Sequence, residues 1–243
     1  SQKTTVLEVL RGRAGISVAS QGGRGGLTSV FMRGGNSAHT KVLLDGIPIN
    51  DPSNASRLFD FSNMTVENIE RIEILRGPQG VLYGSDSIGG VINIVTRRGE
   101  GKPRLEISSM GGSFGTGRSS ISLSGGDKKQ YYSISGSYLS SENISHASSA
   151  RGNSEKDPYR NGTVSGRFGR HLGEDLHLDY VFRYTEAEAE IDDFDFLTGL
   201  PVDNLGRANL ANQFFHRIQM QKLQMDGSIE HVVGFSMTDF DRR

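Results

Sequence analysis

The sequence is poor in several features that would otherwise define its class. It has no cysteine, so a disulfide framework and a thiolate metal site are both excluded. Its 243 residues include only 6 prolines and carry a formal net charge of −1. A disordered chain would be expected to show more proline and a higher net charge. The near-zero charge also gives no electrostatic reason to expect a nucleic-acid partner.

Long hydrophobic runs are also missing. No stretch approaches the roughly 18 apolar residues that a transmembrane helix requires. No signal peptide is visible at Ser1, which is typical of a mature or truncated start. A membrane location stays open, because the strands of a β-barrel give only a weak hydropathy signal. Glycine is abundant, with 32 residues, and with short alternating segments it indicates many turns and a β-rich protein.

The first part of the chain contains short, nearly continuous apolar runs such as Val42–Leu44. Runs of this kind are typical of strands buried on both faces. We expect one short helix over Thr5–Leu10 and another over Thr65–Ile69. Glycine pairs and prolines separate these segments. Residues 1–98 therefore predict a small mixed α+β domain, and residues 99–103 predict a linker.

Beyond the linker the hydrophobic period becomes two. Within Leu176–Tyr184, apolar residues at even positions alternate mainly with polar ones. About seven such antiparallel strands fit into residues 104–243, joined alternately by tight turns and by long polar segments at 141–161 and 186–213. This arrangement is typical of outer-membrane β-barrels, although a soluble antiparallel sandwich also alternates. Barrels that surround a plug have about 22 strands, so on the membrane interpretation we expect an incomplete barrel.

Four motifs occur in a defined order within the first hundred residues. They are SVFMRG at Ser29–Gly34, VLLDGIPIN at Val42–Asn50, IERIEILRGPQG at Ile69–Gly80 and VLYGSDSIGGVINIVT at Val81–Thr96. Their order and spacing resemble the plug domain of TonB-dependent outer-membrane receptors over roughly residues 5–98. Within that family the chain is most similar to the cobalamin transporters, through YGSDSIGG at Tyr83–Gly90 and the glycine loop Gln21–Gly26.

The resemblance implies an α+β plug followed by antiparallel strands of an outer-membrane barrel in a Gram-negative bacterium. It implies TonB-dependent uptake of a scarce nutrient chelate, with cobalamin expected and a ferric siderophore or haem as alternatives. The implied partners are the TonB complex, outer-membrane lipid and the chelate, and no cofactor is required. The family's TonB box and first plug strand are not found from Ser1 onward, so we expect both to lie upstream. A surface β adhesin is the alternative from another class.

Two plug loops are the best candidates for substrate contact. Arg24 stands among glycines in the first, and Asn50–Phe59 forms the second. Their amide and hydroxyl groups suit a neutral or zwitterionic polar ligand. The predicted contacts are Arg24, Asn50, Asp51, Ser53, Asn54 and Arg57. Ordinary turn chemistry explains an Asn-Asp-Pro-Ser sequence equally well.

The charged residues of the plug need partners if the plug lies inside a barrel, because a buried unpaired charge is costly. We predict a polar network between plug and barrel that is formed by Arg33, Glu70, Arg71, Glu73 and Arg76. In the family such groups lock plug strands to the barrel wall. Local structural salt bridges are the simpler alternative.

An acidic run falls in the second long polar segment. Several carboxylates in a flexible loop could hold calcium, a hard cation that takes about 6–8 oxygen ligands. The candidate ligands are Asp192, Asp193, Asp195 and Asp203. Resemblance to the cobalamin transporters favours calcium, because they order such loops with it. The spacing does not match an EF-hand, and a solvated acidic loop is the simpler alternative.

Catalysis has little support in the sequence. GGSFG at Gly111–Gly115 fits the G-x-S-x-G elbow of hydrolases, but in those enzymes the elbow leads into a helix. The alternating segment Ser119–Leu123 predicts a strand instead. The six histidines show no metal-ligand spacing. We therefore expect no enzymatic activity.

Overall fold

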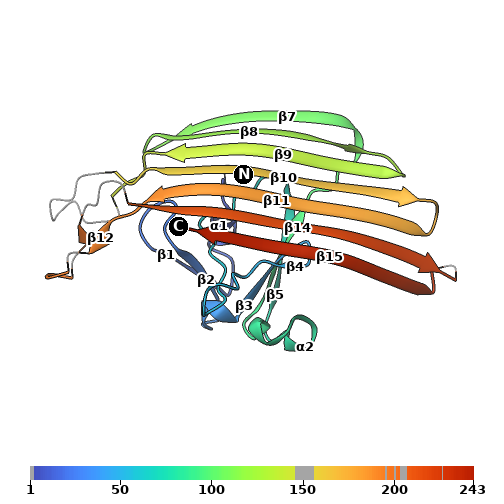
Figure 1. Ribbon diagram of the computed structural model, residues 1–243, viewed down its shortest axis with the longest axis horizontal. Coiled ribbons are helices and arrows are strands. Elements are labelled where there is room, and N and C mark those ends of the chain that lie inside the picture. The colour runs from blue at the N-terminus through green and yellow to red at the C-terminus, as the bar shows by residue number, and fades with distance from the viewer. Residues whose placement is uncertain (1–2, 146–155, 195, 200, 203–206, 226) are drawn as a thin grey trace.

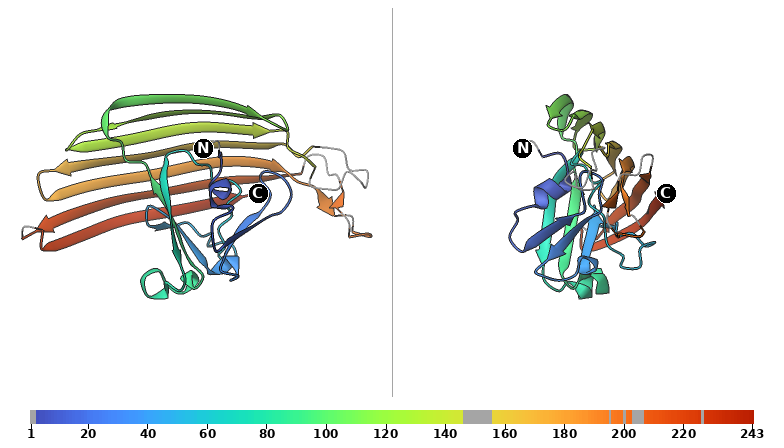
Figure 2. Two further views of the ribbon diagram at one scale, coloured as in Figure 1. Left: turned by 180° about the vertical axis from the view of Figure 1, so that it is seen from behind. Right: turned by 90° about the vertical axis from the view of Figure 1, so that its left-hand side faces the viewer.

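A long curved wall of strands forms one part of the molecule, and a smaller α+β unit lies against it (Figure 1). The structure is a computed structural model that describes residues 3–145, 156–194, 196–199, 201–202, 207–225 and 227–243. Seen along the strands, the wall curves around one side of the smaller unit (Figure 2). We call the two parts the wall and the plug.

The wall is a seven-stranded antiparallel sheet with the strand order β15-β14-β11-β10-β9-β8-β7. Its strands are β7 (Gly101–Gly112), β8 (Thr116–Gly126), β9 (Gln130–Ser141), β10 (Tyr159–Leu172), β11 (Leu176–Glu190), β14 (Ala208–Gln224) and β15 (Ile229–Arg242). A separate hairpin of β12 (Asp193–Phe194) and β13 (Pro201–Val202) lies between β11 and β14. Because β7 begins at Gly101, part of the segment expected as a linker is strand.

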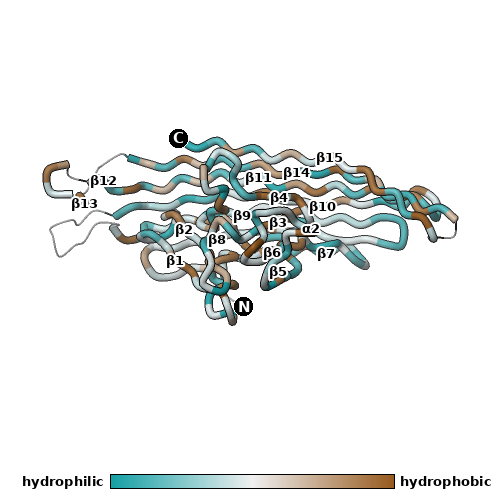
Figure 3. Tube along the Cα trace, turned by 90° about the horizontal axis from the view of Figure 1, so that it is seen from below, coloured by the Kyte–Doolittle hydropathy of each residue, from teal (hydrophilic) through white to brown (hydrophobic). Residues whose placement is uncertain are grey.

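Side chains of the wall alternate between two faces, which explains the period of two in the sequence. In β10, Ser165 and Arg167 are buried, whereas Val164 and Phe168 are exposed. The antiparallel register carries the alternation across the sheet, with Phe168 opposite both Tyr132 and Tyr180. Hydrophilic and hydrophobic residues accordingly follow one another along the wall strands (Figure 3). The face toward the plug is mainly polar and the outward face is mainly apolar.

The plug is built around a four-stranded sheet with the order β4-β3-β6-β5, in which β3 and β6 are parallel. Its strands are β3 (Thr40–Leu44), β4 (Ile47–Pro48), β5 (Ile69–Arg76) and β6 (Gly90–Thr96). A second, two-stranded sheet pairs β1 (Ile16–Ser20) with β2 (Thr28–Met32). The short helical segments are α1 (Val6–Leu10), α2 (Gly80–Tyr83), η1 (Ser37–His39) and η2 (Ser85–Ser87).

The helix predictions have mixed outcomes. The helix at Thr5–Leu10 is confirmed as α1, where Thr5 caps the amide of Glu8 and the Glu8 side chain bonds back. The helix at Thr65–Ile69 is wrong, because Thr65 bridges to Thr5 and Ile69 already begins β5. The short α2 was not foreseen. No helix within the described ranges is long and apolar enough to cross a membrane.

The hydrophobic core of the plug extends into the wall. Val6, Leu44, Ile92 and other plug residues form one buried cluster with Phe215 of β14, which has 0% exposure. Phe240 of β15 packs against the same cluster. Burial of these rings joins plug and wall into one packed unit.

Replacing Phe215 with alanine should lower the free energy of unfolding by about 3–5 kcal/mol, because a buried aromatic ring leaves a cavity. Urea unfolding of the protein in detergent micelles measures this. Phe214→Ala is the matched control, since Phe214 is only partly buried and precedes Phe215 on the other face of the same strand. Equal effects of the two substitutions would contradict the packing described.

Candidate functional site

A two-residue hairpin turn brings Asp45 to the wall. Leu44 and Ile47 pair across it, and Asp45 and Gly46 both have positive φ, 49° and 83°. These are the conditions of a type I′ turn, for which Asp-Gly is a favoured sequence. The Asp45 side chain is only 2% exposed. It accepts hydrogen bonds from the Thr96 hydroxyl at 2.6 Å and the Thr96 backbone N–H at 3.1 Å.

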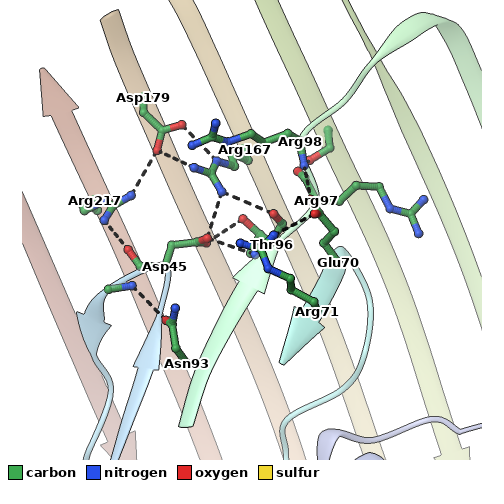
Figure 4. Close-up of polar contacts among 12 residues, drawn as sticks. Asp45, Glu70, Arg71, Asn93, Thr96, Arg97, Arg98, Arg167, Asp179 and Arg217 are labelled. Carbon is green, nitrogen blue, oxygen red and sulfur yellow. Dashed lines mark hydrogen bonds and ion pairs between the residues drawn. The ribbon is translucent and has the colours of Figure 1, made fainter. Parts of the chain in front are cut away.

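Asp45 is one member of a buried ion network that joins plug and wall (Figure 4). Arg167 of β10 lies 3.0 Å from Asp45 Oδ1 and 3.0 Å from Asp179 Oδ2 of β11. Arg217 of β14 lies 3.2 Å from Asp179 Oδ1 and donates to the backbone carbonyl of Asp45. Positive and negative groups alternate, so each charge has a partner, which is the condition for burying charges. The network therefore fixes the β3–β4 turn against three neighbouring wall strands.

Two further arginines of the wall hold the irregular segment before β5. Arg183, with 0% exposure, donates to the Thr65 carbonyl at 2.9 Å, the Thr65 hydroxyl at 2.6 Å and the Glu67 carbonyl at 3.2 Å. Arg118 forms an ion pair with the Glu67 carboxylate. Contacts to these carbonyls satisfy backbone groups that a helix would otherwise have used. They explain why the segment around Thr65 is not helical.

The five residues predicted for the plug–barrel network lie elsewhere. Arg71 pairs with Glu70 and Glu73 at 2.8 Å each, and hydrogen bonds from Asn93 and Arg71 lower the pKa of Glu73. Arg76 donates to the Ala14 carbonyl at 3.0 Å. Within the described residues, neither these residues nor Arg33 pairs with the seven wall strands. Their contact with another part of a barrel stays a prediction.

The sequence did contain a signal for the residues that the prediction missed. Arg167, Asp179, Arg183 and Arg217 occupy odd positions of their strands, between the apolar even positions that face outward. A charged residue of that parity must point toward the plug. Parity identifies which wall residues can meet the plug, although it does not identify their plug partners.

The glycine loop between β1 and β2 is fixed to the wall by its backbone. Asn143, just after β9, accepts from the Arg24 backbone N–H and donates to the Arg24 carbonyl, both at 3.1 Å. A methyl group on Gly25 would lie 2.5 Å from Ala189 Cβ and 2.6 Å from the Tyr159 ring. Only glycine permits this approach, and Gly25 also has φ +84°.

The Arg24 side chain lies between two hollows. Its guanidinium is 3.4 Å from Glu8 Oε1 and 3.4 Å from the Thr4 hydroxyl. One hollow, of about 250 Å³, is lined by α1, the glycine loop and Tyr159. The other, of about 510 Å³, is lined by the glycine loop, the β7–β8 turn and Asn143. Both hollows present hydroxyl and charged groups around Arg24.

The second predicted loop divides into structural and exposed residues. Asn50 donates to the carbonyls of Thr40 and Arg57 and accepts from the Val42 backbone N–H, so its amide is fully used in holding the loop. Asp51 is buried, accepts from Ser53 and lies 3.5 Å from Arg242 of the wall.

The remaining predicted contacts of this loop are more open. Asn54 accepts from the Ser56 backbone N–H, Ser53 is exposed, and the Arg57 side chain is 66% exposed. Within the described residues, no hydrogen bond or ion pair joins this loop to Arg24. Polar interactions of Arg24 therefore do not connect the two predicted loops.

The predicted calcium ligands fall only partly within the described residues. Asp193 lies 2.5 Å from Arg207, and Asp192 accepts from the Ser145 hydroxyl at 3.3 Å. Asp195 and Asp203 lie outside the described residues. The described residues include no group of three acidic, histidine or cysteine side chains arranged for a metal. The two described carboxylates alone do not fit a calcium site, so that site stays a prediction.

A plug that packs against an antiparallel wall, with an apolar outer face and long segments at one end, defines a plugged outer-membrane barrel. Residues 1–91 match the model of the TonB-dependent Receptor Plug Domain. The chain belongs to the TonB-dependent receptors and contains the plug domain and antiparallel strands of a partial barrel. Like the other members of this family, it is an outer-membrane protein of a Gram-negative bacterium.

Known relatives support this assignment along most of the chain. The Vitamin B12 transporter BtuB of Photobacterium profundum is 35% identical over 195 residues, which are 79% of this chain and 31% of that protein. A mutant ferric enterobactin receptor of Pseudomonas aeruginosa, solved with enterobactin, has a TM-score of 0.73 at 16% identity, over 98% of this chain and 39% of its own. The ferric yersiniabactin uptake receptor FyuA of Yersinia pestis has a TM-score of 0.70 at 18% identity, over the same shares. The two structural likenesses show the fold, and the chain spans about a third of the transporter's length.

Asp45→Asn should lower the free energy of unfolding by about 3 kcal/mol, because it leaves Arg167 and Arg217 with one carboxylate between them in a buried site. Urea unfolding in micelles measures the change. Glu70→Gln is the control, since the exposed Glu70–Arg71 pair contributes less than about 1 kcal/mol. If Asp45→Asn is as mild as the control, the network does not hold the plug.

Gly25→Ala should loosen the glycine loop from the wall, because its methyl group would overlap Ala189 and Tyr159. Gly34→Ala is the matched control, since Gly34 has φ +75° and nothing within 4 Å of an added methyl group. Hydrogen exchange of residues 21–26 should become faster in the first variant and stay unchanged in the second. Unchanged exchange in both variants would show that close packing does not fix the loop.

Proposed function

We propose that this chain supplies the plug and part of the wall of a transporter that takes up cobalamin across the outer membrane with energy from TonB. The observation that carries this is the 35% identity to a protein named as a vitamin B12 transporter. That match covers 195 residues and therefore extends beyond the plug into the wall strands. On this proposal the protein is a transporter and has no catalytic role.

The hollows around Arg24 are the proposed contact surface for cobalamin. They lie at the end of the wall that carries the long connecting segments, which in outer-membrane barrels is the extracellular end. Cobalamin presents amide side chains and one phosphodiester. The guanidinium of Arg24 can donate hydrogen bonds to both kinds of group.

The second loop contributes less than the sequence suggested. Because Asn50 and Asp51 are occupied in holding the loop, we keep only Ser53, Asn54 and Arg57 as proposed substrate contacts. Arg57 is 3.9 Å from Asp86 and largely exposed, so its guanidinium can turn toward a ligand.

Release of the substrate would require a path between plug and wall. The buried network at Asp45 resists separation of the two parts, and a pull from TonB on the plug would have to break it or unfold the plug around it. Polar interfaces of this kind can open locally at lower free energy than an apolar core. We propose that the Asp45 network keeps the plug closed in the absence of a pull.

Calorimetric titration of the full-length protein with cyanocobalamin, with and without calcium, tests the proposed substrate. We expect binding, and Arg24→Gln should weaken it about tenfold through loss of a charge-assisted hydrogen bond. Arg13→Gln is the control, since Arg13 is an exposed plug residue that lines neither hollow.

Each outcome of this titration decides a separate point. Tighter cobalamin binding with calcium would support the predicted calcium site in the acidic loop. Equal binding with and without calcium would contradict that prediction. Absence of cobalamin binding together with binding of a ferric siderophore would overturn the proposed substrate.

A further inference from the structure

The outward face of the wall contains a hollow of about 500 Å³ that the transport proposal does not use. It spans four neighbouring strands, β9, β10, β11 and β14, near the end with the tight turns. We call it the outer groove and define it by Tyr132, Phe168, Arg170, Leu178, Tyr180 and Ile218. Its size falls within the range of small-molecule sites.

The outer groove exists because the aromatic rings around it pack against neighbouring residues and do not cover its floor. The Tyr132 ring lies over Gly125 of the neighbouring strand. Phe168 and Tyr180 both stack on Phe182, with ring centroids 6.4 Å and 5.9 Å away. Phe182 in turn lies over Gly166, where a methyl group would be 2.6 Å from its ring. The rings therefore gather on two sides and leave the surface over Leu178 and Ile218 open.

The position of Arg170 on β10 places it at one boundary of the apolar band. Arg160 and Arg170 are the outward-facing charges of this strand and lie ten positions apart. At about 3.3 Å per residue and a tilt of about 40°, they are separated by about 25 Å across the membrane, the height of the apolar band of such barrels. Tight turns mark the periplasmic end, so Arg170 lies at the headgroups of the inner leaflet.

The two boundary arginines differ in their partners. Arg160 lies 3.2 Å from Glu188 on the neighbouring strand. In the part of the chain that the structure describes, the Arg170 guanidinium has neither an ion-pair nor a hydrogen-bond partner. The acid in the lining, Asp179, is paired with Arg167 and Arg217 on the inward face. A cation at the rim of an apolar groove, without an anion of its own, is complementary to an amphiphile with an anionic head.

Other charges at this level do not neutralise Arg170. Lys222 is the other outward-facing cation on the described wall strands at this end. The adjoining turns carry Lys128, Lys129, Asp127, Glu174 and Asp175. Asp127 is engaged with the backbone N–H groups of Lys129 and Gln130. Outward-facing acids of β11, such as Glu186 and Glu188, lie at the opposite end.

We propose that the outer groove binds one glycerophospholipid of the inner leaflet. An acyl chain would lie over Leu178 and Ile218, beside the rings of Phe168 and Tyr180, and the phosphate would accept hydrogen bonds from Arg170. A guanidinium can donate two parallel hydrogen bonds to one phosphate, which gives orientation as well as affinity. A bound lipid would fix the depth of β10 and β11 in the membrane.

Native mass spectrometry of the full-length protein in mild detergent tests this, with phosphatidylglycerol as the probe. Diacylglycerol with the same chains is the comparison ligand, because it lacks only the phosphate headgroup. Arg170→Gln should weaken binding of the first phosphatidylglycerol about tenfold, as expected for loss of a charge-assisted hydrogen bond. It should leave the weaker binding of diacylglycerol unchanged.

Three further variants distinguish lipid binding in the outer groove from non-specific binding of lipid elsewhere on the wall. Ile218→Trp fills the groove without changing charge and should also weaken binding about tenfold, since it removes the apolar site. Lys222→Gln removes the other outward cation, and Val233→Trp adds a ring to an exposed outward site beyond the groove. Both should bind within about twofold of the unmodified protein.

Loss in Arg170→Gln and Ile218→Trp with retention in the other two supports the proposal. Unchanged binding in Arg170→Gln, or equal loss in Lys222→Gln, overturns it. Equal affinity of the unmodified protein for phosphatidylglycerol and diacylglycerol overturns it as well.

Discussion

The structure depends on one constraint, that each charge buried between plug and wall needs an ion-pair or hydrogen-bond partner. Asp45 and Asp179 alternate with Arg167 and Arg217, and the two aspartates are 2% and 5% exposed. A missing member would leave a charge in a site that water hardly reaches. The type I′ turn at Asp45–Gly46 carries Asp45 to the wall. The alternation of side chains in β10, β11 and β14 turns the charged residues of these strands toward Asp45, so that the pairs can form. The network thereby sets the orientation of the plug on the wall.

Each wall strand faces two different environments. Its inward positions meet the plug with hydroxyl groups and charges, and its outward positions form an apolar band. Glycines allow close approach on both faces: Gly25 of the plug lies against Ala189, and Gly166 of the wall lies beneath the Phe182 ring. The same alternation that pairs Arg167 with Asp45 therefore places Phe168 and Arg170 on the membrane side. A substrate path and a lipid site can occupy opposite faces of one strand.

Much of this could be predicted from the sequence, because the relevant signals are local. The period of two gave the strands and their faces, and the ordered plug motifs gave the family. The helix expected at Thr65–Ile69 fails because Arg183, more than a hundred residues away, takes the carbonyls of that segment. Local propensity contains no information about such a partner.

The choice of residues for the plug–barrel network shows the same limit. Arg71 and Glu73 have the charges expected of an interface, but they lie on β5, an edge strand whose charges pair with one another. The turn residue Asp45 reaches the wall instead. Similarly, Asn50 has the chemistry of a ligand contact, yet its amide is used within its own loop. Which edge of a small sheet meets a partner is decided by packing over long sequence separations.

A double-mutant cycle between Asp45→Asn and Arg167→Gln tests the central claim most directly, through urea unfolding of the full-length protein in micelles. If the two groups stabilise each other across the plug–wall interface, the coupling free energy should be about 2 kcal/mol or more, as for charge pairs in direct contact at a buried site. A coupling close to zero, with additive effects of the two substitutions, would show that the buried network does not hold the plug against the wall.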